Sequence, residues 1–181
     1  DQGLRVTAEV CPHHFTMSDQ EITGDDGRFK MNPPLRSPKD VQALKDALAS
    51  GVMDVISTDH APHGAQEKAQ SMKKAPFGIV GLETAACLTY SELVLGGYLT
   101  PMQMAEKMSC NPARLIPIDR GDIQPGKIAD IVIFDPNETY AIDKNTFASK
   151  GRNTPFDGRK VTGRVRYTIC NGTVVYNYEN N

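Results

Sequence analysis

Short apolar runs alternate with an amphipathic stretch in the first part of the chain. Residues 4–10 (LRVTAEV) and 52–57 (VMDVIS) are short and rich in β-branched side chains, which predicts two buried strands. The segment between them, residues 38–50, carries apolar side chains at helical spacing, at Val41, Leu44 and Leu48. Alternation of strand and helix is typical of an α/β fold.

Local end signals support the predicted helices. Ser37 followed by Pro38 predicts an N-cap with proline at the first helical position, and Gly51 predicts the end of that helix. Residues 81–95 are mostly apolar and compatible with a second helix. Residues 100–103 (TPMQ) form a capping box, which predicts the start of another helix.

The pattern changes near residue 120. Residues 128–134 (IADIVIF) predict a strand, and residues 165–170 and 173–176 predict two more. The dipeptide Asn171-Gly172 lies between the last two and predicts a hairpin, because both central residues of a type I′ turn need positive φ. We therefore expect an α/β part over residues 1–120 and a β-rich part over residues 121–181.

The composition is that of an ordinary globular protein and excludes several classes. The 181 residues are 39% hydrophobic and 23% charged, with a formal net charge of −2. This balance gives no basic face for nucleic acid, no run of about 18 apolar residues predicts a membrane span, and no secretory signal is visible. The four widely spaced cysteines are expected to be free thiols, as in a cytoplasmic protein, at Cys11, Cys87, Cys110 and Cys170.

Polar side chains follow each of the first two predicted strands. Residues 57–63 (STDHAPH) begin where a strand ends, which is where active-site groups gather in α/β barrels. Asp59 could hold a metal and accept a proton there, or it could accept hydrogen bonds within a turn. His60 and His63 could be ligands, substrate contacts or loop histidines. Residues 11–14 (CPHH) follow the other strand, but adjacent histidines usually point in different directions and make a poor chelate.

Two further segments could contact a ligand. Asn32 lies in residues 31–34 (MNPP), and its amide has two donors and an acceptor, which suits an amide- or imide-bearing ligand. The alternative is an asparagine that serves a turn. Phe77 and Gly78 lie in a bend before the helical segment, where the backbone at Gly78 could approach a ligand closely. The alternative is an ordinary loop.

Seven segments follow one another in a specific order along nearly the whole chain. They are TAEVCPHHF, FKMNPPLR, STDHAPH, EKAQ, APFGIVGLET, GDIQPGKIADIVIFDP and SKGRNTPFDGRKVTGRVRYTICNGTVVY. In combination they resemble the dihydroorotase family of the amidohydrolase superfamily, in its longer bacterial type, which is related to allantoinase and hydantoinase. The resemblance implies an α/β fold in which residues 1–120 are the C-terminal portion of a (β/α)8 TIM-like barrel. Residues 121–181 would be a segment of a small β-sandwich domain.

The resemblance also implies roles for five residues. Asp59 matches the aspartate after the eighth barrel strand, which binds zinc and shuttles the proton of the attacking hydroxide. Asn32 and His63 match substrate-binding residues. Phe77 and Gly78 match a pair that contacts the pyrimidine ring, largely through the backbone.

The implied reaction needs groups that have no match in this chain. In the family, two zinc ions activate water for the reversible hydrolysis of dihydroorotate to N-carbamoyl-aspartate, a step of pyrimidine biosynthesis. The family's HxH pair, its bridging carboxylate or carboxylated lysine, two further histidines and an arginine have no counterpart here. His13 and His14 match no metal-binding position of the family. We therefore expect an incomplete C-terminal part that is inactive alone.

The resemblance implies a small-molecule substrate, and it allows a homodimer and an association with aspartate transcarbamoylase. Neither nucleic acid nor a membrane is expected as a partner. Two alternatives stay open. One is a cyclic amidohydrolase of the allantoinase or dihydropyrimidinase type, and the other is a non-catalytic dihydroorotase-like partner of aspartate transcarbamoylase.

Overall fold

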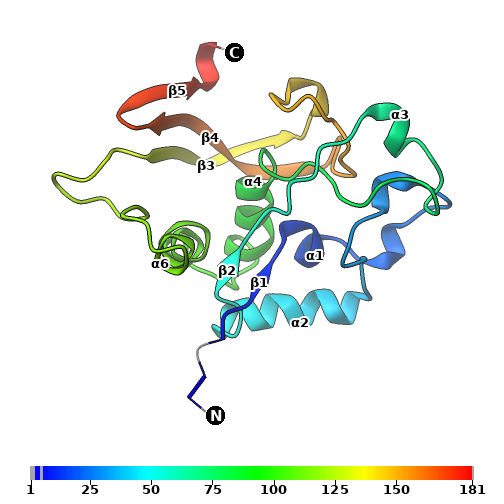
Figure 1. Cartoon of the computed structure of the whole chain (residues 1–181), viewed down its shortest axis with the longest axis horizontal. Coiled ribbons are helices and arrows are strands. Elements are labelled where there is room, and N and C mark those ends of the chain that lie inside the picture. Colours follow the sequence, from blue (N-terminus) through cyan, green and yellow to red (C-terminus); the bar gives the residue numbers. More distant parts are fainter. Residues whose placement is uncertain (1–2, 5, 181) are drawn as a thin grey trace.

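A short parallel sheet lies among helices, and a longer antiparallel sheet covers one side of them (Figure 1). The computed structural model describes residues 3–4 and 6–180. In the parallel sheet, β1 (Glu9–Val10) pairs with β2 (Val55–Ile56). The antiparallel sheet has the order β3–β4–β5 and consists of β3 (Ile131–Ala141), β4 (Lys160–Cys170) and β5 (Thr173–Asn177).

Six α-helical segments lie in the described residues. They are α1 (Pro12–Thr16), α2 (Pro38–Ala49), α3 (Ala65–Lys68), α4 (Ala85–Thr89), α5 (Pro101–Ala105) and α6 (Asn111–Leu115). A π-helical segment, Tyr90–Val94, continues α4, and another, Glu106–Cys110, joins α5 to α6. Single 3-10 turns lie at Asp19–Glu21, Gly27–Phe29, Lys144–Thr146 and Tyr178–Asn180. In this part of the chain, no helix is long and apolar enough to cross a membrane.

Both predicted helix starts are confirmed, and so is the stop of α2. The Asp40 amide donates to Ser37 Oγ at 3.3 Å, and the Ser37 amide donates to the Asp40 carboxylate at 3.1 Å. Thr100 and Gln103 form the same reciprocal pair at α5. Gly51 follows α2 with a φ of +81°, a conformation that glycine adopts without steric cost.

The predicted hairpin is confirmed at the end of the antiparallel sheet. Asn171 and Gly172 join β4 to β5 with φ values of +50° and +76°. The preceding strand differs from its prediction, because β3 begins three residues later than residue 128 and runs on to Ala141. Its extra length pairs with β4, where Tyr140 lies opposite Val161.

The predicted strand over residues 4–10 is wrong for most of its length. Leu4 and Val6 are 74% and 79% exposed, and Arg5 lies outside the described residues. Pairing with β2 begins only at Glu9, so the chain before it has no partner strand among the described residues. The strand predicted over residues 52–57 is shortened in the same way, because β2 covers only Val55–Ile56.

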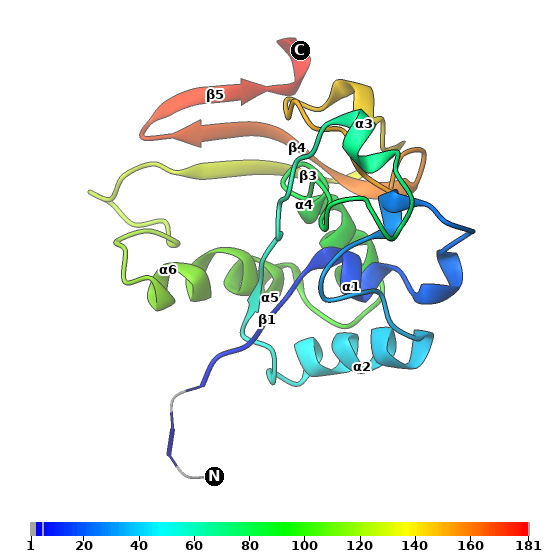
Figure 2. The same ribbon diagram turned by 45° about the vertical axis from the view of Figure 1, so that its right-hand side comes forward.

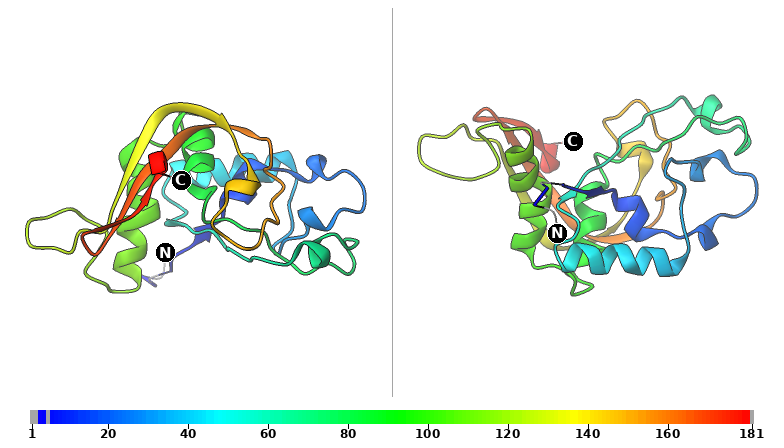
Figure 3. Two further views of the ribbon diagram at one scale, coloured as in Figure 1. Left: turned by 90° about the horizontal axis from the view of Figure 1, so that it is seen from above. Right: turned by 60° about the horizontal axis from the view of Figure 1, so that its bottom comes forward.

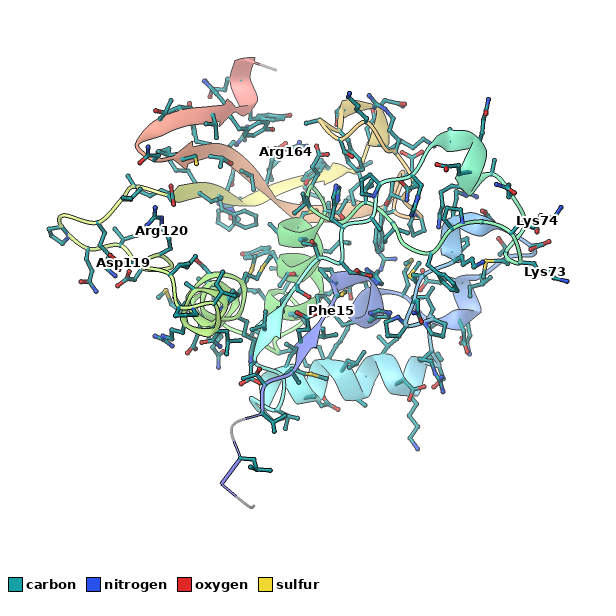
Figure 4. The ribbon with its side chains drawn as sticks, viewed as in Figure 1. Phe15, Lys73, Lys74, Asp119, Arg120 and Arg164 are labelled. Carbon is teal, nitrogen blue, oxygen red and sulfur yellow. The ribbon has the colours of Figure 1, made fainter. Side chains whose placement is uncertain are left out.

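Two apolar clusters hold the elements together. One lies around the β1–β2 pair, with Phe15 near the centre of the molecule (Figure 4), and its buried members are Val10, Phe15, Leu48, Ile56, Leu93 and Leu99. The other includes Met31, Leu88, Phe156 and Val161, so residues from the β-rich part complete the core of the first part. The four cysteines are free, as predicted, and Cys11 and Cys87 are buried.

The antiparallel sheet packs on α4 and on the π-helical segment that follows it (Figures 2 and 3). Thr162 of β4 donates its amide to Ser91 Oγ at 2.8 Å, and Ser91 Oγ donates to the Thr162 carbonyl at 3.1 Å. The rings of Tyr90 and Phe134 meet edge to face at 5.2 Å. A domain division at residue 120 stays a prediction.

Candidate functional site

The segment after β2 carries an unusual backbone conformation at Asp59. The strand residues Val55 and Ile56 are buried, whereas Asp59 is exposed and has a φ of +48°. Aspartate tolerates the left-handed region better than most residues, yet few non-glycine residues adopt it. Such positions concentrate at functional sites. The carboxylate predicted to carry chemistry is therefore held at the strand end, facing solvent.

The two histidines of this segment hold backbone groups of its neighbours. The amides of Gly81 and Leu82 donate to His60 Nδ1 at 3.1 and 3.4 Å, so this nitrogen is an unprotonated acceptor. His63 Nε2 donates to the Phe77 carbonyl at 2.8 Å. Of the roles left open by the sequence, the structure gives His60 a loop-holding one.

Asn32 lies on a neighbouring segment that is anchored by the residue before it. Met31 is 1% exposed and belongs to the core, whereas Asn32 is exposed. On one side of this segment His14 Nε2 donates to the Pro33 carbonyl at 2.8 Å. On the other side the Gly78 amide donates to the Lys30 carbonyl at 2.9 Å. The exposed amide of Asn32 is thus carried by a backbone fixed on both sides.

Phe77 and Gly78 lie on the third segment. Phe77 is 56% exposed, and Lys30 Nζ lies 4.5 Å from the centroid of its ring. Gly78 is buried with a φ of +105°, and a Cβ at this position would collide with the side chain of Ala61. Only glycine fits this close approach without strain.

Backbone hydrogen bonds join the three segments into one surface. The Ala61 amide donates to the Ile79 carbonyl at 2.8 Å, which ties the Asp59 segment to the Phe77 segment. The bond from Gly78 to Lys30 ties the latter to the Asn32 segment. The structure therefore brings together the segments of the five residues singled out by the sequence. Their assignment to catalysis and binding stays a prediction.

Lys68 is a site residue to which sequence reasoning gave no role. It is 2% exposed, and its Nζ donates to the carbonyls of Lys30 and Pro76, at 3.0 Å each. Burial, reinforced by the charge of Lys30 and opposed by Asp26, lowers the pKa of Lys68 to about 8. Lys68 thus bridges two of the three segments. The available signal was its place in the EKAQ segment of the resemblance.

Asn153 was also missed, because it lies in the β-rich part. Its side chain is buried and hydrogen-bonds to the backbone of Ala61, His63 and Gly78. The segment NTPF belongs to the resemblance, but nothing in its spacing indicates that it reaches the strand-end loops.

Three side chains at the end of β1 carry atoms that could together bind a metal ion. Ligand atoms of Cys11, His13 and His14 all lie within 4.8 Å of one another, although adjacent histidines were expected to be a poor chelate. Burial, reinforced by His14, lowers the pKa of His13 to about 3, so this imidazole stays neutral. Its Nε2 has no hydrogen-bond partner among the described residues. Burial raises the pKa of the Cys11 thiol to about 11, which opposes the thiolate form that metals bind.

The described residues do not form the two-zinc centre that the resemblance implies. Asp59 offers one exposed carboxylate, a ligand type that zinc accepts, but zinc sites use at least about three protein ligands. In the part of the chain that the structure describes, the one such group of three does not include Asp59. Asp59 is therefore a single candidate ligand.

Residues 9–175 match the amidohydrolase family. The chain belongs to this family. The match spans the three segments of the site and most of the β-rich part, so both parts belong to one family pattern.

Among curated members of the amidohydrolase family, the similar relatives are dihydroorotases. The chain is 53% identical over 174 residues to the dihydroorotase of Pelotomaculum thermopropionicum and 47% identical over 175 residues to that of Geobacter metallireducens. These matches cover 96% and 97% of this chain but 41% of each relative. The chain thus spans about two fifths of the length of these relatives.

Solved structures agree on the fold. The L-hydantoinase (dihydropyrimidinase) of Arthrobacter aurescens superposes with a TM-score of 0.86 at 30% identity, over 94% of this chain and 39% of that one. The D-hydantoinase (dihydropyrimidinase) of Thermus sp. gives 0.88 at 26% identity, over 97% and 40%. An α/β amidohydrolase fold is therefore established for this chain.

Proposed function

We propose that this chain is the C-terminal part of a zinc-dependent dihydroorotase. The reaction is the reversible hydrolysis of the cyclic amide of dihydroorotate to N-carbamoyl-aspartate. The observation that carries the proposal is the 53% identity to a dihydroorotase over 174 residues. The identity spans all three segments of the site.

The proposed architecture has residues 1–120 as the C-terminal portion of a (β/α)8 barrel and residues 121–181 as a segment of a small β-sandwich domain. Two features support it. β1 and β2 are parallel neighbours with α2 between them in sequence, which is the repeating unit of such barrels. The later strands are antiparallel, as in sandwich domains.

In this proposal each of the five residues either binds the substrate ring or transfers a proton during its hydrolysis. The Asp59 carboxylate accepts the proton of the attacking water and returns it to the ring nitrogen that leaves. The Asn32 amide pairs with donor and acceptor groups of the ring. The exposed Phe77 ring and the Gly78 backbone contact the ring of the substrate, and His63 contacts the substrate from the Asp59 segment.

A second candidate is hydrolysis of hydantoin or dihydropyrimidine rings. It is favoured by the similar solved structures, which are hydantoinases and dihydropyrimidinases. These rings share the cyclic amide but lack the carboxylate of dihydroorotate. The higher identity to dihydroorotases, 53% against 30%, favours the first proposal.

The test begins with the intact mass of the purified native protein, because the chain spans only 41% of its relatives. The same preparation is then assayed for zinc content and for hydrolysis of dihydroorotate, allantoin, dihydrouracil and hydantoin. Preference for dihydroorotate supports the proposal, and preference for another ring overturns it. Size-exclusion chromatography with and without aspartate transcarbamoylase tests a homodimer and that association, which are part of the proposal.

A further inference from the structure

Asn153 is a buried amide at the edge of the β-rich part. Asn153 is 5% exposed. Thr154 and Phe156, which follow it, are 1% exposed, so the segment is anchored in the core. A buried amide that is left unpaired costs free energy, and its hydrogen-bond partners therefore show what it holds.

Three hydrogen bonds from this side chain reach the strand-end loops. Nδ2 donates to the Ala61 carbonyl at 3.0 Å and to the Gly78 carbonyl at 3.2 Å. Oδ1 accepts from the His63 amide at 3.0 Å. Both Nδ2 hydrogens and the Oδ1 oxygen of Asn153 are thus hydrogen-bonded, and their partners lie on two loops that carry predicted site residues. An asparagine side chain offers this combination, whereas an aspartate would face two carbonyl oxygens with a carboxylate.

The backbone around Asn153 follows the same loops. The Val80 amide donates to the Asn153 carbonyl at 3.1 Å. Gly151 packs on Pro62, and a Cβ there would lie 2.7 Å from the Pro62 Cβ. The segment therefore fits closely against the Asp59 segment and the Phe77 segment at once.

We propose that Asn153 is a positioning residue for the site. It fixes the Ala61–His63 backbone relative to Gly78 and so sets the distance between the Asp59 and His63 loop and the ring-contacting loop. The role in substrate binding rests on the proposed function, but the role in holding the loops does not. In this proposal the β-rich part has two roles. It covers α4, and through Asn153 it holds the loops that follow the strands.

The test compares Asn153→Ala with Asn111→Ala in the purified protein. Asn111 is a matched control, because its Nδ2 donates to the Asp54 carbonyl at 2.8 Å, at the opposite end of β2. The first readout is amide hydrogen exchange at Ala61 and Gly78. Their amides bond to Ile79 and Lys30 and not to Asn153, so faster exchange reports displaced loops.

We expect exchange at Ala61 and Gly78 to rise about tenfold in Asn153→Ala and to stay unchanged in Asn111→Ala. Unchanged exchange at both amides in a folded Asn153→Ala protein overturns the proposal. If Asn153→Ala fails to fold, Asn153→Asp serves instead, since it keeps the size and the acceptor for His63 but loses both donors. The same two amides then decide the outcome.

The second readout is steady-state hydrolysis of dihydroorotate. We expect KM to rise about tenfold in Asn153→Ala with kcat changed less than about threefold, and neither constant to change more than about twofold in Asn111→Ala. If a wild-type preparation whose intact mass is that of a full-length protein does not hydrolyse dihydroorotate, the proposed function fails, while the exchange result still decides the positioning role. Equal KM values in the wild type and Asn153→Ala would show that Asn153 has no role in substrate binding.

Discussion

The two ends of the β1–β2 pair are held by the same kinds of side chain but present different surfaces. At the amino end, the buried Lys107 donates to the Met53 carbonyl at 2.6 Å, and Asn111 donates to the Asp54 carbonyl. At the carboxyl end, Lys68 and Asn153 also bond to backbone carbonyls. One lysine and one asparagine therefore stabilise each end.

The difference lies in what those bonds hold. At the amino end they fasten the α5–α6 run to the residues just before β2. At the carboxyl end they fasten loops that expose Asn32, Asp59 and Phe77. Polar side chains that are buried or half-buried thus anchor both ends, and only at the carboxyl end do they hold loops that expose groups able to bind a ligand. The following predictions test this distinction.

The largest effect is expected at Asp59. Asp59→Asn removes the proposed proton acceptor, so turnover of dihydroorotate should fall at least about 10³-fold. Asparagine tolerates a positive φ as aspartate does, and the exposed side chain has no core contacts to lose. The melting temperature should therefore stay unchanged. Near-normal turnover in this variant would rule out the assigned role.

Gly78→Ala should be the most destabilising single change at the carboxyl end, by about 3 kcal/mol. The new methyl group meets Ala61, and the backbone stays at a φ of +105°. Gly126→Ala is the control, because its φ is +87° but its Cβ would meet nothing within 4 Å. Urea unfolding should give about 1 kcal/mol for that control. Equal losses would mean that the close approach to Ala61 is unimportant.

Exchanging each buried lysine for methionine compares the two ends directly. Lys68→Met removes the side-chain donor to the Pro76 carbonyl, and Lys107→Met removes the one to the Met53 carbonyl, so each should cost about 2 kcal/mol in urea unfolding. Only Lys68→Met should loosen the loops, because its two acceptors belong to the Asn32 and Phe77 segments. Hydrogen exchange at Gly78 measures this. A similar increase in both variants would break the distinction between the ends.

Lys68 should also give the protein a distinctive pH dependence. Its folded-state pKa is about 8, below the usual 10.5, because the folded protein disfavours the charged form. Between pH 8 and 10.5 the unfolded chain therefore binds more protons, and stability rises with pH by up to about 1.4 kcal/mol per unit. Wild-type unfolding free energies should show this slope relative to Lys68→Met. A parallel pH dependence in the two proteins would argue against the shift.

The features that were predictable from the sequence are those with local signals. The capping boxes at Ser37 and Thr100 and the Asn171-Gly172 hairpin each depend on neighbours within a few residues, and each is confirmed. The strand over residues 4–10 failed because β-branched composition does not say whether a partner strand lies alongside. The site segments were located through strand ends and family resemblance.

The anchors of the site could not be found in this way. Lys68 bonds to a carbonyl 38 residues away, and Asn153 to one 92 residues away. A backbone carbonyl is present at every residue, so an acceptor leaves no mark in the sequence. The Cys11, His13 and His14 group shows the converse, because the motif was visible but only α1 brings the three ligand atoms together.

The smallest effect is expected at a helix cap that belongs to neither end. Ser37→Ala removes the acceptor for the Asp40 amide and should cost about 1 kcal/mol of unfolding free energy. Thr100→Ala removes the matching acceptor at α5 and should cost a similar amount. Because neither cap contacts the strand-end loops, both losses should leave exchange at Ala61 and Gly78 and the KM for dihydroorotate unchanged.

A contrary outcome would change the interpretation of the other variants. If Ser37→Ala, at a cost of about 1 kcal/mol, raised exchange at Ala61 and Gly78, the order of the loops would depend on the stability of the whole protein. The effects expected for Asn153 and Lys68 would then not be specific to the carboxyl end.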